Sequence, residues 1–326
     1  MILSCPACSS SYVIKKGKRK TKQGTEQRYL CKTCHKTFVH RGFKNKTYPA
    51  EVILEAVNLY HRGYTLKETK NTINKKFKSH TTQSSVQRWI QEYKDLCTYH
   101  TLRIIQMKQY GKDIIVSKDF IYNGLAYNFK YHKGKLDVLG KKYPVLVSYI
   151  KRFESGCPSF FDSIKNRCSK LRIEIIVEKT HCDAPICKLV SLALNVPSTK
   201  RGRHSIVESF LLINDDSTIA VEVPVWLWEK NLALSIAGHI DLIQIAHGYV
   251  YILDYKPDTA KENENAVASQ LYLYALGLSF RTGIPLKMMR CAWFDEHDYF
   301  EFEPKKAIVK YPTKPENSYD GNQQKK

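Results

Sequence analysis

Two β-rich runs separated by only two residues constrain the fold of this chain more than any other feature. Residues 240–246 and 249–255 are rich in β-branched and aromatic side chains, and His247-Gly248 lies between them. This pattern is typical of a β-hairpin with a tight turn. A two-residue loop would place Asp241 directly opposite Asp254.

The predicted hairpin ends in a charged cluster. Opposed residues of an antiparallel pair share one face, with Cβ atoms about 5 Å apart, and Lys256 lies two residues beyond Asp254 on the same side. Two carboxylates this close repel each other, and a divalent cation between them would relieve the repulsion. Oxygen ligands favour Mg²⁺ or Mn²⁺. The alternative is a solvated hairpin end in which Lys256 neutralises two surface acids.

A helix is expected next along the chain. Residues 266–280 have a helical pattern that Gly283 can end. Gln270 and Tyr274 are four residues apart, so they share one face of this helix.

Three of these segments together resemble the motifs of a known enzyme family. Gly238-His-Ile-Asp241, Asp254-Tyr-Lys256 and Gln270-Leu-Tyr-Leu-Tyr274 resemble the RecB-type branch of the PD-(D/E)xK nucleases, whose pattern the CRISPR-associated Cas4-like exonucleases share. The resemblance covers about residues 200–300. It implies an α/β, restriction-endonuclease-like core with a mixed sheet flanked by helices, and metal-dependent hydrolysis of phosphodiester bonds in DNA.

The resemblance also assigns roles to single residues. Lys256 would orient the attacking water or stabilise the transition state, and Gln270 and Tyr274 would position the nucleic-acid strand. The predicted catalytic residues are Asp241, Asp254, Lys256, Gln270 and Tyr274, and the predicted ligands of the divalent cation are His204, Asp241, Asp254 and the backbone carbonyl of Tyr255.

Two further residues near this set have more than one interpretation. His204 and Glu208 are four residues apart and share a helix face, but a histidine in a basic turn also fits the surface. Glu222 lies in a strand expected over residues 219–228. It either faces the cation or points outward between valines, and the pattern favours the outward position.

Two cysteine pairs near the N-terminus predict a zinc site. Cys5-Pro-Ala-Cys8 and Cys31-Lys-Thr-Cys34 each offer two thiolates on a tight turn, and four thiolates complete a tetrahedral zinc site. A segment of about 40 residues buries little core, so the metal would supply the folding energy. Residues 1–40 resemble the zinc ribbon of insertion-sequence transposases, most closely over residues 27–38.

Three short helices are expected after the ribbon. The first covers residues 48–60, the second begins at Thr65 with Glu68 as its capping-box partner, and the third covers about residues 83–96. This arrangement indicates a helix-turn-helix, as in transposase N-termini, whose third helix enters the major groove. The alternative is a scaffold or dimerisation element. The predicted DNA contacts are Gln83, Ser84, Gln87 and Arg88 on the third helix, with Lys18 and Arg19 in the ribbon.

The charge of the chain supports a nucleic-acid partner. The net charge is +21 over 326 residues, and residues 1–100 hold 20 Lys/Arg against 6 Asp/Glu, a net of +14. A field of this sign attracts polyanions. We expect DNA as the partner and no membrane, since no apolar run is long enough to span one. A homo-oligomer stays open.

Six of the ten cysteines lie outside the two pairs. Cys157, Cys168, Cys182 and Cys187 have no paired spacing, so free thiols are favoured over a second metal or iron–sulfur site. Cysteines that serve as metal ligands or free thiols, together with the lack of a signal-peptide pattern, predict an intracellular, cytoplasmic and nucleoid-associated protein.

The sequence therefore predicts a multidomain protein: a small β zinc ribbon (1–40), a three-helix helix-turn-helix (47–97), a connecting region (98–140), an α/β nuclease core (141–311) and a disordered tail (312–326). The predicted function is a metal-dependent DNA nuclease. The alternatives are a DNA-binding regulator with an inert nuclease-like domain and a mobile-element transposase or recombinase.

Overall fold

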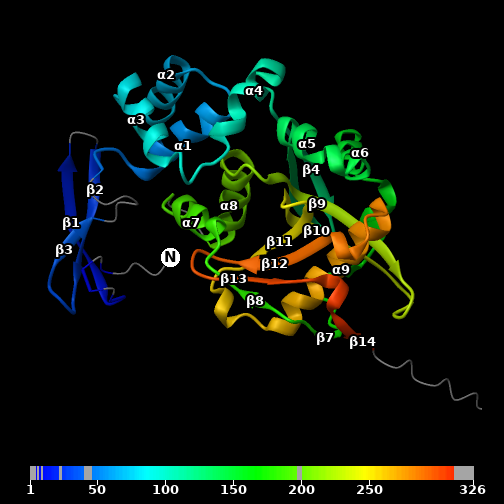
Figure 1. Ribbon diagram of the computed structural model, residues 1–326. Coiled ribbons are helices and arrows are strands. Elements are labelled where there is room, and N and C mark those ends of the chain that lie inside the picture. The colour runs from blue at the N-terminus through cyan, green and yellow to red at the C-terminus, as the bar shows by residue number, and fades with distance from the viewer. Residues whose placement is uncertain are drawn as a thin grey trace, which may run out of the picture.

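The structure is a computed structural model that describes residues 5, 7–8, 10–21, 24–39, 46–196 and 200–311. The predicted tail, 312–326, lies outside the described residues. The first sheet is small and antiparallel, with strand order β1 (Val13–Thr21), β2 (Gly24–Cys31), β3 (Thr37–Val39). Figure 1 shows it beside the larger body of the molecule.

Three helices that pack against one another follow the small sheet: α1 (Ala50–His61), α2 (Leu66–Phe77) and α3 (Gln83–Tyr93). The predicted capping box at the start of α2 is confirmed. The Thr65 side chain accepts a hydrogen bond from the backbone N–H of Glu68, whose carboxylate accepts one from the N–H of Thr65. A fourth helix, α4 (His100–Tyr110), leads into the main body.

A nine-stranded mixed sheet forms the centre of the main body. The pairs β11–β12 and β6–β10 are parallel, and the other pairs are antiparallel. Along the sheet the order is β4 (Ile115–Tyr122), β5 (Leu125–His132), β9 (Thr218–Glu229), β10 (Leu234–Ala246), β11 (Tyr249–Tyr255), β12 (Met289–Phe294), β13 (Tyr299–Phe302) and β8 (Thr180–His181), with β6 (Asn166–Arg167) attached to β10. Residues 115–132 of the predicted connecting region thus lie in this sheet.

Helices cover both faces of the large sheet (Figure 1). Ile243 and Ile252 share a core with α6 (Pro144–Lys151) and α9 (Glu264–Thr282). The adjacent residues Leu242 and Leu253 share the other core with α7 (Pro185–Ala193) and α8 (Lys200–Asn214). Successive residues of a strand point to opposite faces, so a single hairpin contributes to both cores. The body also contains α5 (Lys133–Leu139) and the strand pair β7 (Glu174–Ile176) and β14 (Ile308–Lys310).

The helices α1–α3 are attached to the main body through a shared core. Val57 and Trp89 belong to the same buried cluster as Leu211 of α8. His61 Nδ1 lies 2.7 Å from the side-chain oxygen of Asn214 at the end of α8. The three helices and the sheet therefore form one packed unit rather than two units joined by a flexible linker.

The predicted hairpin is confirmed. Strands β10 and β11 pair from Ala246↔Tyr249 to Leu242↔Leu253. The turn residues His247 and Gly248 have φ angles of 49° and 80°. Positive φ at both central positions identifies the type I′ turn that suits the twist of a hairpin. None of the described helices is long and apolar enough to cross a membrane.

Candidate active site

The open end of the β10–β11 hairpin carries Asp241 and Asp254, one step beyond the pair Leu242↔Leu253. Asp254 is fully buried, and its Oδ2 lies 2.6 Å from Nζ of Lys256. Asp241 Oδ2 accepts a hydrogen bond of 3.3 Å from the backbone N–H of Tyr255. Both carboxylates and the ammonium group line one cavity of about 170 Å³.

Helix α9 contributes Gln270 and Tyr274 to the same cavity. The side-chain amide of Gln270 donates to Asp254 Oδ1 and to the hydroxyl oxygen of Tyr274, both at 3.1 Å. A Cβ at Gly238 would lie 2.7 Å from Cε1 of Tyr274. A larger residue at Gly238 would therefore displace the ring that supports Gln270.

Helix α8 contributes His204 and Glu208 to the same cavity. His204 Nδ1 lies 3.9 Å from Asp241 Oδ2, and the His204 ring packs against the Tyr255 ring at 5.1 Å. His204, Glu208 and Asp241 each offer a ligand atom within 4.8 Å of the others. The spacing of His204 and Glu208 predicts that they share one helix face, but it assigns no role to Glu208.

Glu222 of β9 faces the cavity, so the outward position expected for it is wrong. The β9–β10 register, with Ile240↔Val223 and Leu242↔Val221, places Glu222 opposite Asp241. The φ angle of Glu222 is 51°, which interrupts the normal alternation of the strand. Non-glycine residues in this conformation are strained, and they concentrate at functional sites. A period-two pattern could not predict this local change of backbone.

The acids of the cavity repel one another. Burial and the Glu222 charge raise the pKa of Glu208 well above its usual value, and burial and the Asp254 charge raise the pKa of Asp241 in the same way. Burial and Asp254 also raise the pKa of Glu222 to about 7. Burial lowers the pKa of Lys256, but Asp254 and Asp241 raise it overall. The ammonium group of Lys256 and the guanidinium of Arg167 line the cavity with four carboxylates and offset them only in part.

The residues present fit a divalent cation. The donor set of one imidazole and several carboxylates is one that hard cations accept. Glu208 Oε1 is buried and has no hydrogen-bond partner among the described residues. A cation would provide that partner and offset the repulsion between the acids.

The sequence comparison agrees with this geometry. Residues 195–321 match the model of the PD-(D/E)XK nuclease superfamily. This segment is a PD-(D/E)XK nuclease superfamily domain. No curated protein and no solved structure matched the chain.

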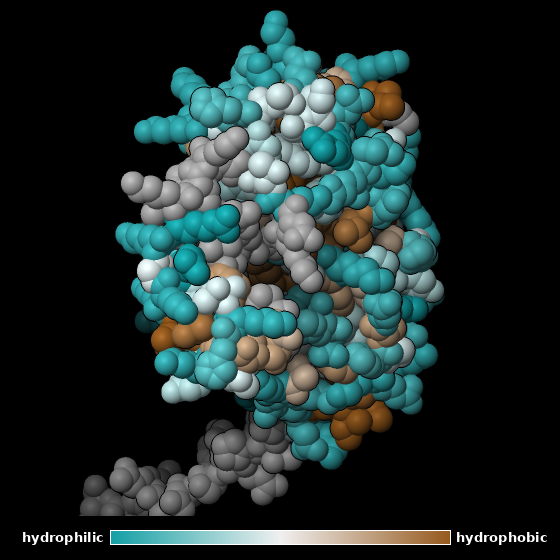
Figure 2. Space-filling model, turned by 90° about the vertical axis from the view of Figure 1, so that its left-hand side faces the viewer, coloured by the Kyte–Doolittle hydropathy of each residue, from teal (hydrophilic) through white to brown (hydrophobic). Residues whose placement is uncertain are grey.

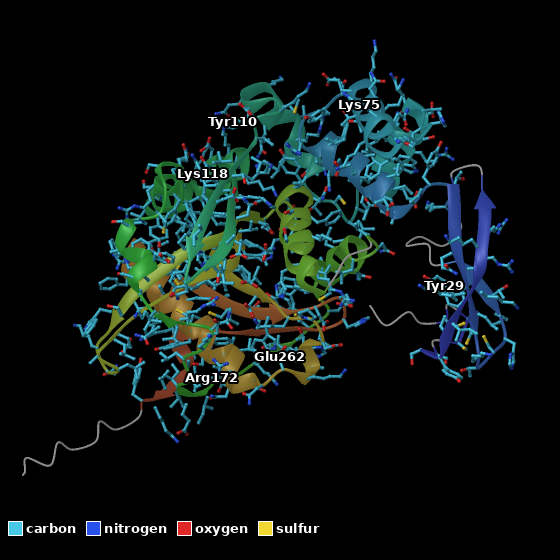
Figure 3. All side chains as sticks on the ribbon, turned by 180° about the vertical axis from the view of Figure 1, so that it is seen from behind. Tyr29, Lys75, Tyr110, Lys118, Arg172 and Glu262 are labelled. Atoms are coloured by element: carbon cyan, nitrogen blue, oxygen red, sulfur yellow. The ribbon has the colours of Figure 1, made fainter. Side chains whose placement is uncertain are left out.

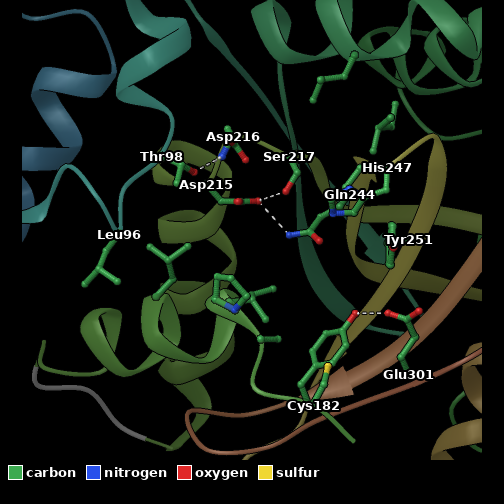
Figure 4. Close-up of a pocket in the computed structure, with 18 of the residues that line it drawn as sticks. Leu96, Thr98, Cys182, Asp215, Asp216, Ser217, Gln244, His247, Tyr251 and Glu301 are labelled. Carbon is green, nitrogen blue, oxygen red and sulfur yellow. Dashed lines mark hydrogen bonds between the residues drawn. The ribbon is translucent and has the colours of Figure 1, made fainter. Parts of the chain in front are cut away.

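A larger cavity of about 620 Å³ lies outside this candidate site, between α4, α7 and the sheet (Figure 4). In this cavity the Asp215 carboxylate already accepts hydrogen bonds from Ser217, Thr218 and Gln244. None of the candidate nuclease residues lines it. We therefore place the chemistry in the smaller cavity, where a histidine, acids and a lysine converge.

The predicted DNA-contacting residues of α3 lie on one side of the helix. Gln83, Ser84, Gln87 and Arg88 are exposed, whereas Val86 and Trp89 pack inward. Lys18 and Arg19 of β1 are also exposed. Figure 2 shows that the face on this side of the molecule is mostly hydrophilic. Tyr29 of the small sheet and Lys75 of α2 both lie on the side away from β14 (Figure 3).

The four N-terminal cysteines lie close together in the small sheet region, before the superfamily domain in the chain. Each of Cys5, Cys8, Cys31 and Cys34 offers an Sγ within 4.8 Å of the others. The Sγ atoms of Cys5 and Cys34, and those of Cys8 and Cys31, are 3.5 Å apart. Sulfur ligands about 2.3 Å from a tetrahedral zinc are separated by about 3.8 Å. The backbone N–H of Cys34 lowers the pKa of Cys31, whereas the pKa of Cys8, which the backbone of Ser10 lowers, is raised overall by burial and the neighbouring thiols.

The other cysteines form no metal-ligating group within the part of the chain that the structure describes. Cys168 and Cys187 are buried, and Cys182 is exposed. Burial raises the pKa of Cys168 to about 12, as expected of an inert buried thiol.

Proposed function

We propose that this protein is a divalent-metal-dependent deoxyribonuclease of the RecB-type, Cas4-like kind, directed to DNA by a zinc ribbon and a helix-turn-helix. The observation that supports this proposal most strongly is the convergence of Asp241, Asp254 and Lys256 with Gln270 in one cavity. The superfamily match covers the segment that contains all four.

His204, Glu208, Asp241 and Asp254 would hold the cation, together with the carbonyl of Tyr255. Such a cation, when bound, lowers the pKa of a coordinated water and offsets negative charge on the phosphate. Its best candidates are Mg²⁺ and Mn²⁺, because the site offers mainly carboxylate oxygens.

The remaining residues orient the groups that react. Lys256, already 2.6 Å from Asp254, would orient the attacking water or stabilise the charge that develops on the phosphate. Gln270 holds Asp254 Oδ1 and so fixes the direction of its other oxygen. Tyr274 accepts a hydrogen bond from the same amide and fixes Gln270 in turn.

The N-terminal region would supply affinity for DNA. Residues 1–100 hold two-thirds of the excess positive charge, +14 of +21. The exposed side of α3 carries Gln87 and Arg88, which suit adenine and guanine edges. A zinc ion at the four cysteines would hold the ribbon in its fold.

The test is cleavage by the full-length chain with Mg²⁺, Mn²⁺ or EDTA, on circular, free-ended and single-stranded DNA. Asp254→Asn should lose at least about a thousandfold in rate while its DNA affinity in EDTA stays within about threefold. The matched control is Asp258→Asn, because Asp258 is an exposed acid four residues away. Undiminished cleavage by Asp254→Asn would overturn the assignment. DNA binding without cleavage by the wild type would favour the inert regulator, and strand-transfer products would favour a transposase.

A further inference from the structure

The cavity that holds the carboxylates has a second wall, built from residues that precede the superfamily segment. Tyr127 of β5, Arg167 of β6 and Ser169 line it together with His239 of β10. The superfamily match begins at residue 195, so it assigns no role to the first three.

Arg167 is attached rigidly to the strand that carries Asp241. Strand β6 pairs with β10 at Ala237↔Arg167, and the backbone N–H of Cys168 donates to the carbonyl of Ala237 at 2.9 Å. Arg167 therefore lies beside the chain four residues before Asp241. This backbone pairing fixes the main chain at Arg167 relative to the strand that carries Asp241.

Aromatic rings orient the guanidinium group. Its Nη2 donates to the hydroxyl of Tyr127, and its Cζ lies 5.8 Å from the centre of the Tyr122 ring. The Tyr127 ring stacks on His239 at 3.8 Å, with 12° between the planes. Arg167 forms no ion pair with any acid in the described part of the chain, although four carboxylates line the same cavity. Most of its five N–H donors are thus available to a ligand.

His239 provides a second, independent indication of a ligand. The residue is 4% exposed, and neither ring nitrogen has a hydrogen-bond partner among the described residues. Buried polar atoms are nearly always paired, so an unpaired imidazole in a cavity wall indicates a partner outside the chain, either a water or a ligand oxygen. A phosphate oxygen can accept its N–H.

We propose that Arg167, supported by Tyr127 and joined by His239 and Ser169, binds a phosphate of the nucleic-acid strand next to the one that is cut. A planar guanidinium binds phosphate through two parallel hydrogen bonds. The acids and Lys256 at one end would then receive the reacting phosphate, and the Arg167 end would receive its neighbour. This assignment rests on the proposed nuclease function and specifies the substrate contact.

The first test measures binding and does not depend on cleavage. Full-length protein in EDTA is titrated into fluorescent hexathymidine and into the same oligomer with uncharged methylphosphonate linkages. Arg167→Gln should weaken binding of the charged oligomer about 10- to 100-fold and that of the uncharged oligomer less than about threefold. The affinity of Arg167→Lys for the charged oligomer should lie between those of the wild type and Arg167→Gln, because lysine keeps the charge and loses the planar guanidinium.

Two variants separate this role from a structural one. Tyr127→Phe keeps the stacked ring and loses only the hydroxyl that orients Arg167, so it should weaken binding of the charged oligomer by a smaller factor. Lys170→Gln removes an exposed positive charge three residues away and should change binding less than about twofold. The proposal would be overturned if Arg167→Gln weakened binding of both oligomers equally. It would also be overturned if Lys170→Gln weakened binding of the charged oligomer as much as Arg167→Gln does.

The second test divides the kinetic effect. In the presence of the cation, Arg167→Gln should raise KM about 10- to 100-fold and leave kcat within about threefold. The reason is that the contact is equally strong in the bound substrate and in the transition state. A fall in kcat without a change in KM would overturn the neighbouring-phosphate assignment. A wild type that binds as predicted but does not cut would overturn the nuclease proposal and leave the phosphate contact standing.

Discussion

The ammonium group of Lys256 lies 2.6 Å from Oδ2 of the buried Asp254 carboxylate. The other oxygen of that carboxylate, Oδ1, accepts a hydrogen bond from Gln270. Lys256 therefore places one positive charge directly beside the buried Asp254 carboxylate. It offsets one of four carboxylates that burial brings together, and the other three have raised pKa values.

This ion pair predicts a coupling between Lys256 and the cation. Lys256→Gln should leave the carboxylates uncompensated, and removal of one partner of a buried ion pair commonly costs about 3–5 kcal/mol. Added Mg²⁺ should therefore raise the melting temperature of Lys256→Gln more than that of the wild type, while cleavage falls about 100-fold or more. Melting curves in EDTA and in Mg²⁺ measure the first effect. Equal Mg²⁺-induced shifts in the two proteins would contradict it.

Gln270 is predicted to position Asp254, in addition to the role of positioning the nucleic-acid strand that the resemblance implies. Gln270→Ala removes the hydrogen bond to Asp254 Oδ1 and should lower the cleavage rate about 10- to 100-fold, as for residues that orient metal ligands. The concentration of Mn²⁺ that gives half-maximal activity should rise in parallel. The control is Tyr272→Phe, a half-buried residue on the same helix outside the cavity. A Gln270→Ala protein with wild-type rate and wild-type Mn²⁺ dependence would show that the hydrogen bond has no such role.

His61 should make the attachment of α1 to α8 sensitive to pH. Burial, opposed by the hydrogen bond to Asn214, lowers the pKa of His61 to about 4, whereas an unfolded chain has a value of about 6.5. Between these values the unfolded chain binds a proton that the folded chain does not. The free energy of unfolding therefore falls as pH falls from about 6.5 to 4, by about 3 kcal/mol for this residue.

Urea unfolding at pH 7 and pH 5 measures this dependence. His61→Gln should reduce the dependence of the unfolding free energy on pH. It should not abolish that dependence, because burial also lowers the pKa of His132. His181→Gln is the control, since His181 is exposed. A His61→Gln protein with the full wild-type pH dependence would contradict the prediction.

The four N-terminal cysteines predict about one zinc per chain. Cys5→Ser or Cys31→Ser should reduce the zinc content well below half and weaken DNA binding, with the melting temperature of the main body unchanged. Metal analysis after dialysis measures the zinc. Cys182→Ser serves as the control because Cys182 is exposed and outside the cluster. Full zinc content in Cys31→Ser would refute a four-cysteine site.

Local patterns predicted the elements whose form depends on near neighbours in the chain. The β10–β11 hairpin follows from His247-Gly248, and the capping box follows from Thr65 and Glu68. The placement of Asp254, Lys256 and Gln270 around one cavity agrees with the spacing of their motifs. Each of these relationships depends on a turn or on a residue spacing within a short segment of the chain.

Other features had no sequence signal. The pairing of β5 with β9 brings residues 115–132 into the large sheet, and that of β6 with β10 brings Arg167 to the acids. Glu222 was misplaced because its pairing opposite Asp241 of β10, together with its positive φ, brings it to the cavity. Each case depends on contacts between residues far apart in the chain.

The sequence by itself determined the hairpin, the cysteine pairs and the motif residues, because their geometry is set within a few residues of backbone. Only the tertiary structure decided that Glu208, Glu222, Arg167 and His239 join that hairpin in one cavity. Packing of α8, β9 and β6 against β10 brings these side chains together, and burial then creates the repulsion and the unpaired donors that define the site.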